Sequence, residues 1–397
     1  MTRFDSWLET QLARIREQGL HRFLRHVEPE GSTGLRFAGR RVRNFAGNDY
    51  LGLARHPEVL RAASEAVTCR GGGAGASRLL SGTFGSHREL EQELARFKGT
   101  AAALVFSSGY AAALGAIPAL VGPGDVVIVD KKAHACIVDA ARLSGATLRV
   151  FRHNDPADLE RLLRWAASPG GDRRILVATE SVFSMDGDLA PLEEIVALKE
   201  RYGAWLLLDE AHATGLYGEC HRGLVEATGQ GGRIEVQMAT LGKALGSAGG
   251  AICGSARLIE FLVNRARSFI FSTAPPPAMT AAATAAIRLL ATPDGDERVA
   301  RLWQNVDTLR ARFAAMGLQV PADRSPILPV TVGDEARAVT VGNRMIAAGF
   351  FVPAVRFPAV PRGQARLRIT VSAAHTDADL AALAQALRTT LSDDPIS

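Results

Sequence analysis

The chain has 397 residues, of which 47% are hydrophobic and 22% are charged, the composition of a soluble globular protein. At roughly 100–200 residues per domain, this length predicts two domains. Lysine and arginine total 46 against 41 for aspartate and glutamate, and no long run of like charges forms a nucleic-acid-binding arm. We therefore expect no nucleic-acid partner.

The cysteines and the apolar stretches bear on the compartment. The four cysteines are scattered and form no CxxC pair, which favours a reduced cytoplasm. Charged residues run through the first twenty positions, where a signal peptide would have an apolar core. Later apolar stretches are broken by glycine and proline well short of the ~20 residues that span a bilayer. We expect a cytoplasmic protein with no membrane partner.

The first segment, residues 1–45, is predicted to be helical at its start. Phe4, Leu8, Leu12 and Ile15 recur at helical spacing, with arginine and glutamate on the other face. This amphipathic helix is expected to stop near Gly19. A polar, glycine-containing stretch follows and leads to residues 44–53.

From about residue 101, short apolar runs alternate with segments of helical period. Continuous apolar runs are typical of strands buried on both faces, and alternation with helices indicates a mainly parallel sheet. We predict a doubly wound α/β domain over residues 46–285. The expected strands are 101–106, 125–130, 147–151, 174–180 and 204–210, and the expected helices include 111–120, 158–165 and 191–202.

The pattern of alternating strands and helices ends at the proline run, residues 275–277. An alanine-rich helical stretch and a long helix over about residues 296–316 come first. Strands are expected in PILPVTV, FFVPAV and RLRITV, and a terminal helix after Thr376. This pattern predicts a smaller α+β domain over residues 286–397.

Polar or titratable groups follow five of the apolar runs. In open parallel sheets, ligands bind outside the carboxyl ends of the strands, so these groups should share one edge. Taken singly, each has an ordinary explanation, such as a helix cap or a solvated side chain. Together they predict a functional site. The groups are Ser108, Gly109 and Tyr110 after the first run, His134 after the second, Glu180 and Ser184, then Asp209 and His212, and finally Thr240 and Lys243.

The combination suits the chemistry of one cofactor. A lysine amine near other cations has a depressed pKa and can form a Schiff base. A carboxylate facing a pyridine nitrogen keeps the ring protonated, and a helix N-terminus binds phosphate through its N–H groups. Lys243, Asp209 and the Ser108-Gly109-Tyr110 turn supply these three parts, so we predict pyridoxal 5'-phosphate (PLP).

At this point the motifs resemble a known family, the α-oxoamine synthases, over essentially the whole chain. These enzymes are a branch of the fold-type-I PLP-dependent transferases. The fold implied is a doubly wound, mainly parallel sheet with a smaller α+β C-terminal domain. Six blocks carry the resemblance: NDYLGL at 48–53, GAGASR with SGT at 73–78 and 81–83, ESVFSMDG at 180–187, DEAHATG at 209–215, TLGKALG at 240–246, and RLRIT at 366–370.

The resemblance implies a role for each matching residue. Lys243 would hold PLP as an imine and act as acid and base at the substrate α-carbon. Asp209 would pair with the ring nitrogen, His212 with the phenolic oxygen, and His134 would stack on the ring. The other implied cofactor contacts are Ser108, Gly109, Tyr110, Glu180, Ser184, Thr240 and, from a partner subunit, Thr273; the implied substrate contacts are Arg22, Asn48, Ser77 and Arg368. No metal is implied.

The implied reaction is a decarboxylative condensation of an amino acid with an acyl thioester. Within the family, the chain most resembles the members that use L-alanine with pimeloyl-CoA, or a pimeloyl carrier protein, in biotin synthesis. This closer resemblance lies in the segments GNDYLGLARHP, SRLLSGT, FRHND and RLRITVSAAHT. Loss of CoA and CO2 would leave an α-aminoketone. The family also implies a homodimer with sites at its interface.

The residues also bear on four alternative interpretations. A sister enzyme using glycine or serine with another acyl-CoA differs by small pocket changes, each worth only ~1–3 kcal/mol. The glycine-rich residues 71–75 do not join a strand to a helix, which argues against a nicotinamide-binding dehydrogenase, and no three ligands have metal-site spacing. A non-catalytic protein on this fold is disfavoured because Lys243 and its supporting groups are all present.

Overall fold

The computed structural model describes residues 1–168 and 173–392, and it divides into two compact units. The large unit comprises Asn48–Ser184 and Asp188–Leu302, and the small unit comprises Met1–Gly47, Met185–Gly187 and Trp303–Ser397. The N-terminal segment thus groups with the C-terminal part, and the second division falls inside a helix, α12 (Pro293–Ala314), rather than at residue 285.

The large unit contains a seven-stranded sheet with the order β4-β10-β9-β8-β7-β5-β6. The pairs β6-β5, β5-β7, β7-β8 and β8-β9 are parallel, whereas β10 is antiparallel to both of its neighbours. The predicted mainly parallel sheet is therefore confirmed. Its strands are β4 (Ala102–Phe106), β5 (Val126–Asp130), β6 (Thr147–Phe151), β7 (Ile175–Glu180), β8 (Trp205–Asp209), β9 (Val236–Thr240) and β10 (Gly250–Gly254).

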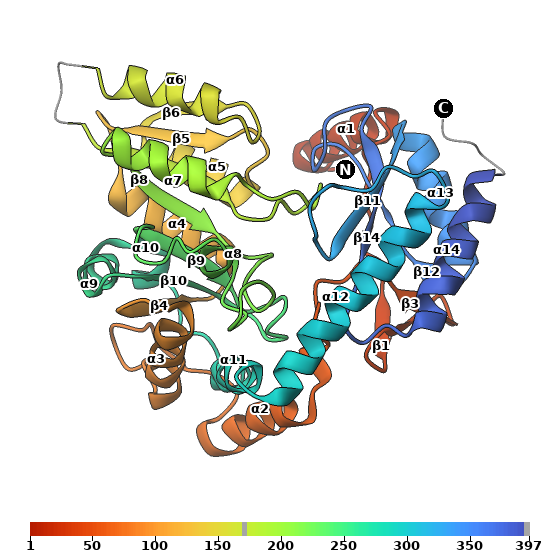
Figure 1. The fold of residues 1–397 in the computed structure, drawn as a ribbon, viewed down its shortest axis with the longest axis horizontal. Coiled ribbons are helices and arrows are strands. Elements are labelled where there is room, and N and C mark those ends of the chain that lie inside the picture. Colours follow the sequence, from red (N-terminus) through yellow and green to blue (C-terminus); the bar gives the residue numbers. More distant parts are fainter. Residues whose placement is uncertain (169–172, 393–397) are drawn as a thin grey trace. The chain divides into compact units, whose positions relative to one another are not determined.

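Alternate side chains of these strands enter two different cores. Val127 and Val129 of β5 pack with helices α4, α5, α9 and α10, whereas Val126 and Ile128 pack with α6, α7 and α8. Helices thus cover both faces of the sheet, as the continuous apolar runs predict (Figure 1). These helices are α4 (Gly109–Leu120), α5 (Ala135–Ser144), α6 (Pro156–Ala166), α7 (Leu192–Arg201), α8 (Leu224–Ala227), α9 (Ala256–Arg265) and α10 (Arg267–Ile270).

The remaining helices of the large unit pack beside one another. Helix α11 contacts both α2 and α3, and a short 3-10 turn, η1 (Leu53–Arg55), leads into α2. Proline stands in the first turn of α2 and of α11, where its missing N–H group leaves no helical bond unmade. The bounds are α2 (Pro57–Arg70), α3 (Gly85–Lys98) and α11 (Pro277–Leu290).

The small unit holds two sheets. One has the order β1-β2-β3-β12 and the other β11-β14-β13. The polar N-terminal stretch thus forms three strands that the sequence did not predict, and FFVPAV, predicted as one strand, forms two short ones. The strands are β1 (Val27–Glu30), β2 (Gly34–Phe37), β3 (Arg40–Asn44), β11 (Ile327–Gly333), β12 (Phe350–Phe351), β13 (Ala354–Val355) and β14 (Ala365–Thr370), and the helices are α1 (Arg3–Glu17), α13 (Glu335–Ala347) and α14 (Asp377–Ser392).

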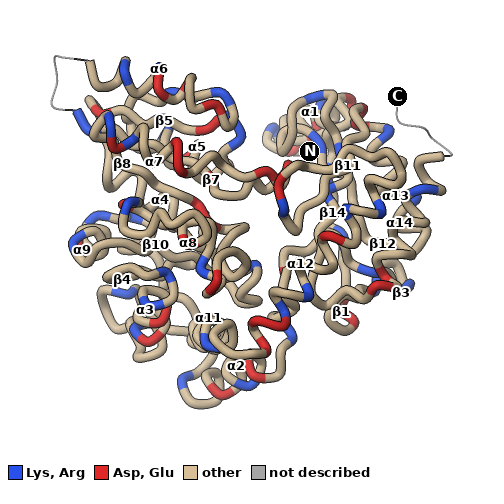
Figure 2. The backbone as a smooth tube through the Cα atoms, in the orientation of Figure 1, with Lys and Arg blue, Asp and Glu red and all other residues tan. Residues whose placement is uncertain are grey.

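Charge is mixed along both units. Figure 2 shows basic and acidic residues interspersed on helices and strands of each unit. Among residues 1–168 and 173–392, none of the helices is both long and apolar enough to cross a membrane.

A buried histidine in the small unit makes its stability dependent on pH. His375 is 4% exposed and stacks on Phe45 with ring centroids 3.9 Å apart. Its Nε2 donates to the carbonyl of Asn44 at 2.9 Å, and its Nδ1 accepts from the N–H of Ser372 at 3.0 Å. Burial lowers the pKa of His375 to about 4. The neutral ring is therefore the folded form.

We expect acid to destabilise the protein through His375. In the unfolded chain His375 takes up a proton near pH 6.5, whereas in the folded chain it does so only near pH 4. The contribution of neutral His375 to the unfolding free energy is therefore complete above pH 6.5 and is lost as the pH falls towards 4. The loss should reach about 3 kcal/mol in unfolding free energy. Denaturant unfolding at pH 7, 5.5 and 4.5 measures it. His375→Gln should flatten this pH dependence; an unchanged slope in that variant would contradict the assignment.

Candidate active site

The site lies at the carboxyl ends of the parallel strands in the large unit. Glu180 and Asp209 end β7 and β8 and are register partners in this pair of strands. Thr240 ends β9, and α4 begins directly after β4. The predicted groups on these strands therefore share one edge of the sheet.

Lys243 stands in a tight turn between β9 and β10. The turn closes through hydrogen bonds from the N–H of Gly246 to the carbonyl of Lys243 at 2.9 Å and from Ser247 to Leu241 at 2.9 Å. Gly246 has a φ of +60°, and a Cβ there would lie 2.3 Å from the backbone nitrogen of Ala54. Only glycine fits this corner, which fixes where Lys243 leaves the backbone.

A chain of polar contacts runs from Lys243 into the unit. The Nζ of Lys243 lies 2.7 Å from the Nε2 of His212, and the Nδ1 of His212 lies 2.6 Å from the hydroxyl of Tyr50. Tyr50 in turn donates to the amide oxygen of Asn48 at 3.2 Å. With Tyr50 donating to Asn48, Nδ1 of His212 donates to Tyr50 and Nε2 accepts from Lys243. His212 is thereby held in the tautomer that accepts a proton from the lysine side.

Two buried carboxyl groups, Asp209 and Glu180, lie near this series of polar contacts. Asp209 accepts a hydrogen bond from the N–H of Ala211 at 2.9 Å. Burial raises the pKa of Asp209, while the Lys243 ammonium opposes that rise. Burial raises the pKa of Glu180 well above its usual range, and the charge of Asp209 raises it further. Since like charges so close do not both ionise readily, we assign the proton to Glu180 and the charge to Asp209.

The start of α4 has the features of an anion-binding helix N-terminus. Ser108 caps the helix by accepting from the N–H of Ala111 at 3.0 Å, and the first turn of a helix leaves N–H groups free for an anion. A Cβ on Gly109 would lie 3.9 Å from the hydroxyl of Thr240. A Cβ on Gly250 would lie 2.5 Å from the Cα of Gly109, so glycine is required there for the close approach of β10.

The other predicted residues of the large unit lie as follows. Ser77 and Thr273 face each other in an isolated antiparallel bridge, and Thr273 is exposed. His134 caps α5 by accepting from the N–H of Cys136 at 3.2 Å, and its ring is exposed. Tyr110 is 40% exposed and its hydroxyl donates to Asp139. Ser184 is half-buried in the loop after β7.

Two predicted substrate contacts belong to the small unit. Arg22 donates to the carbonyl of Phe357 at 2.8 Å, and Arg368 is 8% exposed in the middle of β14. Their roles in the site stay predictions. In the described part of the chain, no three His, Cys, Asp or Glu side chains are grouped as metal ligands.

The structure adds two features that the sequence did not predict. Tyr50 bonds His212 from the side opposite Lys243, although only its place in the NDYLGL block marked it. Glu210, next to Asp209, forms a fully buried ion pair with Lys98. No local signal indicates this pair, because its members are far apart in sequence.

Comparison with known proteins gives consistent results. The pattern of the aminotransferase class I and II family matches residues 40–387. An 8-amino-7-oxononanoate synthase of Geobacter sulfurreducens is 50% identical over 372 residues, which are 93% of this chain and 94% of that protein. A putative 8-amino-7-oxononanoate synthase of Caulobacter vibrioides is 45% identical, over 98% of each chain.

Solved structures give the same fold. A serine palmitoyltransferase from S. paucimobilis with bound PLP–myriocin aldimine superposes with a TM-score of 0.92 at 33% identity, over 99% of each chain. An 8-amino-7-oxononanoate synthase from Francisella tularensis superposes with a TM-score of 0.75 at 26% identity, over 89% of this chain and 98% of that one.

Proposed function

Because this chain belongs to the aminotransferase class I and II family, we propose that it catalyses the reaction of the 8-amino-7-oxononanoate synthases. This reaction is the PLP-dependent, decarboxylative condensation of L-alanine with a pimeloyl thioester, a step of biotin synthesis. Relatives of that name at 42–50% identity over more than nine-tenths of the chain support this choice. The observation that carries the chemistry is the contact between Lys243 and His212 beside the buried Asp209.

The residues present fit PLP. Lys243 would hold the aldehyde carbon, the buried Asp209 would pair with the ring nitrogen, and the start of α4 with Thr240 would hold the phosphate. When bound, PLP supplies an electron sink that stabilises negative charge at the substrate α-carbon and allows loss of CO2.

Proton movement in this site falls to Lys243 and His212. With PLP bound, the Lys243 amine would take the α-proton of the amino-acid substrate as a general base and would return it as an acid. Nε2 of His212 accepts from the Lys243 amine, and Tyr50 holds the other ring nitrogen. His212 therefore orients the Lys243 side chain. It also makes the ammonium form of Lys243 more favourable than an apolar neighbour would, because its Nε2 accepts a hydrogen bond.

We also propose the substrate contacts that the resemblance implies. A guanidinium fork matches a carboxylate geometrically, which supports Arg368, with the amide of Asn48, as the group that binds the amino-acid carboxylate. Arg22 would bind the far end of the acyl donor. Ser77 would line the pocket for the amino-acid side chain.

A homodimer is part of the proposal. Ser77 and Thr273 form an isolated bridge, and the nearby apolar residues Leu80 and Phe271, three and two positions away along the chain, are 81% and 71% exposed in the single chain. Exposed apolar side chains at such a density are typical of a surface that a partner covers. Light scattering on the purified protein measures whether the particle has twice the 42.2 kDa mass of the chain.

The test is a matrix of substrates. Purified protein with PLP is given L-alanine, glycine or L-serine, each with pimeloyl-CoA, acetyl-CoA or palmitoyl-CoA. We expect release of CoA, and a product of the right mass, from L-alanine with pimeloyl-CoA at least about 10-fold faster than from any other pair, since one methyl group in a pocket is worth ~1–3 kcal/mol.

Other outcomes have distinct meanings. Preference for L-serine with palmitoyl-CoA would place the chain with the serine palmitoyltransferases, and the PLP chemistry would stand. Binding of PLP without any condensation product would contradict the proposed reaction. No visible absorbance from bound PLP would contradict the cofactor as well.

A further inference from the structure

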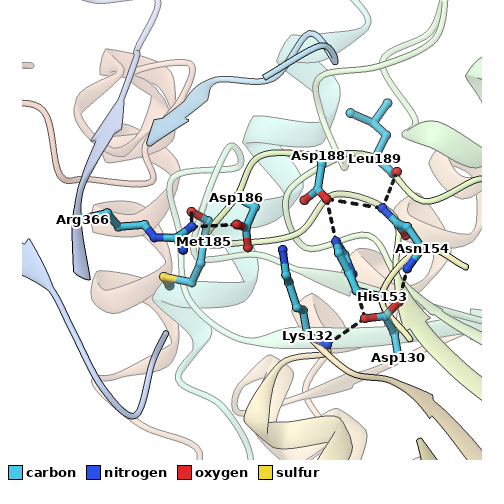
Figure 3. Close-up of polar contacts among 9 residues, drawn as sticks. All are labelled: Asp130, Lys132, His153, Asn154, Met185, Asp186, Asp188, Leu189 and Arg366. Carbon is cyan, nitrogen blue, oxygen red and sulfur yellow. Dashed lines mark hydrogen bonds and ion pairs between the residues drawn. The ribbon is translucent and has the colours of Figure 1, made fainter. Parts of the chain in front are cut away.

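His153 is paired on both ring nitrogens with carboxylates. It lies two residues after the end of β6, and its Nδ1 lies 2.9 Å from Asp130 while its Nε2 lies 2.6 Å from Asp188 (Figure 3). The side chain of His153 is 15% exposed and that of Asp130 is fully buried. A ring that meets an acceptor at both nitrogens donates from both, which is the hydrogen-bonding pattern of an imidazolium.

The contacts Asp130–His153–Asp188 form a bridge. Its Asp130 end bonds to the turn that leads to His134. One carboxylate oxygen of Asp130 accepts from the N–H of Lys132 at 2.7 Å, and the other accepts from the N–H of Asn154 at 3.0 Å. The carboxylate is thus shared between His153 and the two backbone segments that follow β5 and β6. It therefore connects the turn before His134, the N-cap of α5, with the segment after β6.

The Asp188 side fixes the loop that carries Ser184. Residues 181–190 fold back on themselves: the N–H of Phe183 donates to the carbonyl of Asp188, and that of Ala190 to Ser181, both at 3.0 Å. The amide of Asn154 donates to the carbonyl of Leu189 at 2.9 Å. The ring of Phe183 packs edge-on against His153 with centroids 4.4 Å apart.

The charged groups around His153 favour its protonated form. Burial lowers the pKa of His153, but the hydrogen bonds and charges of Asp130 and Asp188 outweigh it and raise the pKa to about 9. The neighbouring cations are Lys132 after β5 and Arg152 before the ring, and Arg152 pairs with Asp155 and lies near Asp158. The bridge is therefore charged throughout the neutral range.

We propose that His153 is a positioning residue that joins the turn carrying His134 to the loop carrying Ser184, and so orders both segments beside the cofactor. The proposal rests on the proposed function, because that function assigns His134 and Ser184 to the cofactor site. The ring of His153 bonds to both carboxylates, and the neighbouring Asn154 supports the same link, with its N–H on Asp130 at 3.0 Å and its amide on Asp188 at 3.4 Å.

The first readout does not depend on activity. Hydrogen exchange, followed by mass spectrometry and corrected for intrinsic rates, is compared between wild type and His153→Leu. We expect faster exchange in the peptides that contain Lys132–His134 and residues 181–190, and little change elsewhere. In the wild type, protection of the same peptides should fall as pH rises through about 9, because a raised pKa gives stability that is complete below the unfolded value and lost above the folded one.

The second readout is kinetic and uses a matched control. His56 is also a buried histidine paired with a carboxylate, at 3.0 Å from Asp294, but it caps α2. We expect His153→Leu to lower kcat/KM for the amino acid by about 10- to 100-fold, as loss of an orienting group does, while the absorbance of bound PLP stays. His56→Leu should lower the melting temperature without this kinetic loss. Asp188→Asn, a milder change, should give a smaller loss of the same kind.

The outcomes separate the two proposals. Unchanged exchange in both peptides, or equal kinetic losses in His153→Leu and His56→Leu, would overturn the positioning role. If the wild type binds no PLP and forms no product, the proposed function fails, and the exchange experiment still decides whether His153 joins the two loops.

Discussion

Replacing Lys243 with alanine is expected to abolish the covalent attachment of the cofactor and to lower the condensation rate by about 10⁴-fold. The loss is large because one amine both holds the cofactor and moves the α-proton, and a positioned acid or base alone contributes about 10²- to 10⁴-fold. The amine lies 2.7 Å from the acceptor nitrogen of His212, and an alanine side chain has no group to replace it. Absorbance spectra and single-turnover assays of the variant measure both effects.

A nearby lysine provides the control for Lys243. Lys131 lies at the same edge of the sheet but is exposed, so Lys131→Ala should retain the cofactor band and keep its rate within about twofold of the wild type. Treatment with borohydride should fix the cofactor to a peptide that contains Lys243. Attachment to a different lysine, or a Lys243→Ala protein that still condenses its substrates at a tenth of the normal rate, would contradict the assignment.

The edge of the sheet could be predicted because parallel strands that are buried on both faces are continuous apolar runs in the sequence. Glu180, Asp209 and Thr240 each end a continuous apolar run, and parallel strands bring such ends together. The order of blocks along the chain then identified the family. Strand β10 was not predicted, because it begins and ends with glycine, has only three apolar residues between them, and runs antiparallel to its neighbours.

The small unit was harder to predict for a related reason. Strands β1 to β3 are short and largely polar, with glutamate, arginine and glycine at most positions, so no apolar period marks them. Pro353 has no N–H to give to a sheet ladder, which accounts for the separation of FFVPAV into β12 and β13.

The contacts that support the site depend on tertiary structure alone. His153 and Asp130 are 23 residues apart, and Lys98 and Glu210 are 112 apart, so neither pair forms a local motif. The sequence predicted a set of residues that would touch the cofactor. It did not identify those that hold them, because a buried ion pair has no spacing rule and each member resembles an ordinary surface charge until the fold brings them together.

The largest effect on stability is expected from Lys98→Met. The side chains of Lys98 and Glu210 are 1% and 0% exposed, and the Lys98 ammonium also donates to the carbonyl of Arg222 at 2.5 Å. Removing the cation leaves the Glu210 carboxylate buried without its counter-charge, which costs about 3–5 kcal/mol of unfolding free energy. Denaturant unfolding at pH 7 measures this loss. The exposed pair of Arg61 with Glu65 is the control, and Arg61→Met should change stability by less than about 1 kcal/mol.

The same substitution tests how the site is supported. The carbonyl of Glu210 accepts from the N–H groups of Ala213 and Thr214, so this residue anchors the turn on which His212 stands. Adding Glu210→Gln to Lys98→Met removes the uncompensated charge, keeps an acceptor for the N–H of Val225, and should recover part of the lost stability. If the double variant is as unstable as the single one, the pair acts through packing and not through charge. If Lys98→Met alone costs less than about 1 kcal/mol, water reaches Glu210, and the turn that presents His212 to Lys243 is held by its backbone bonds instead.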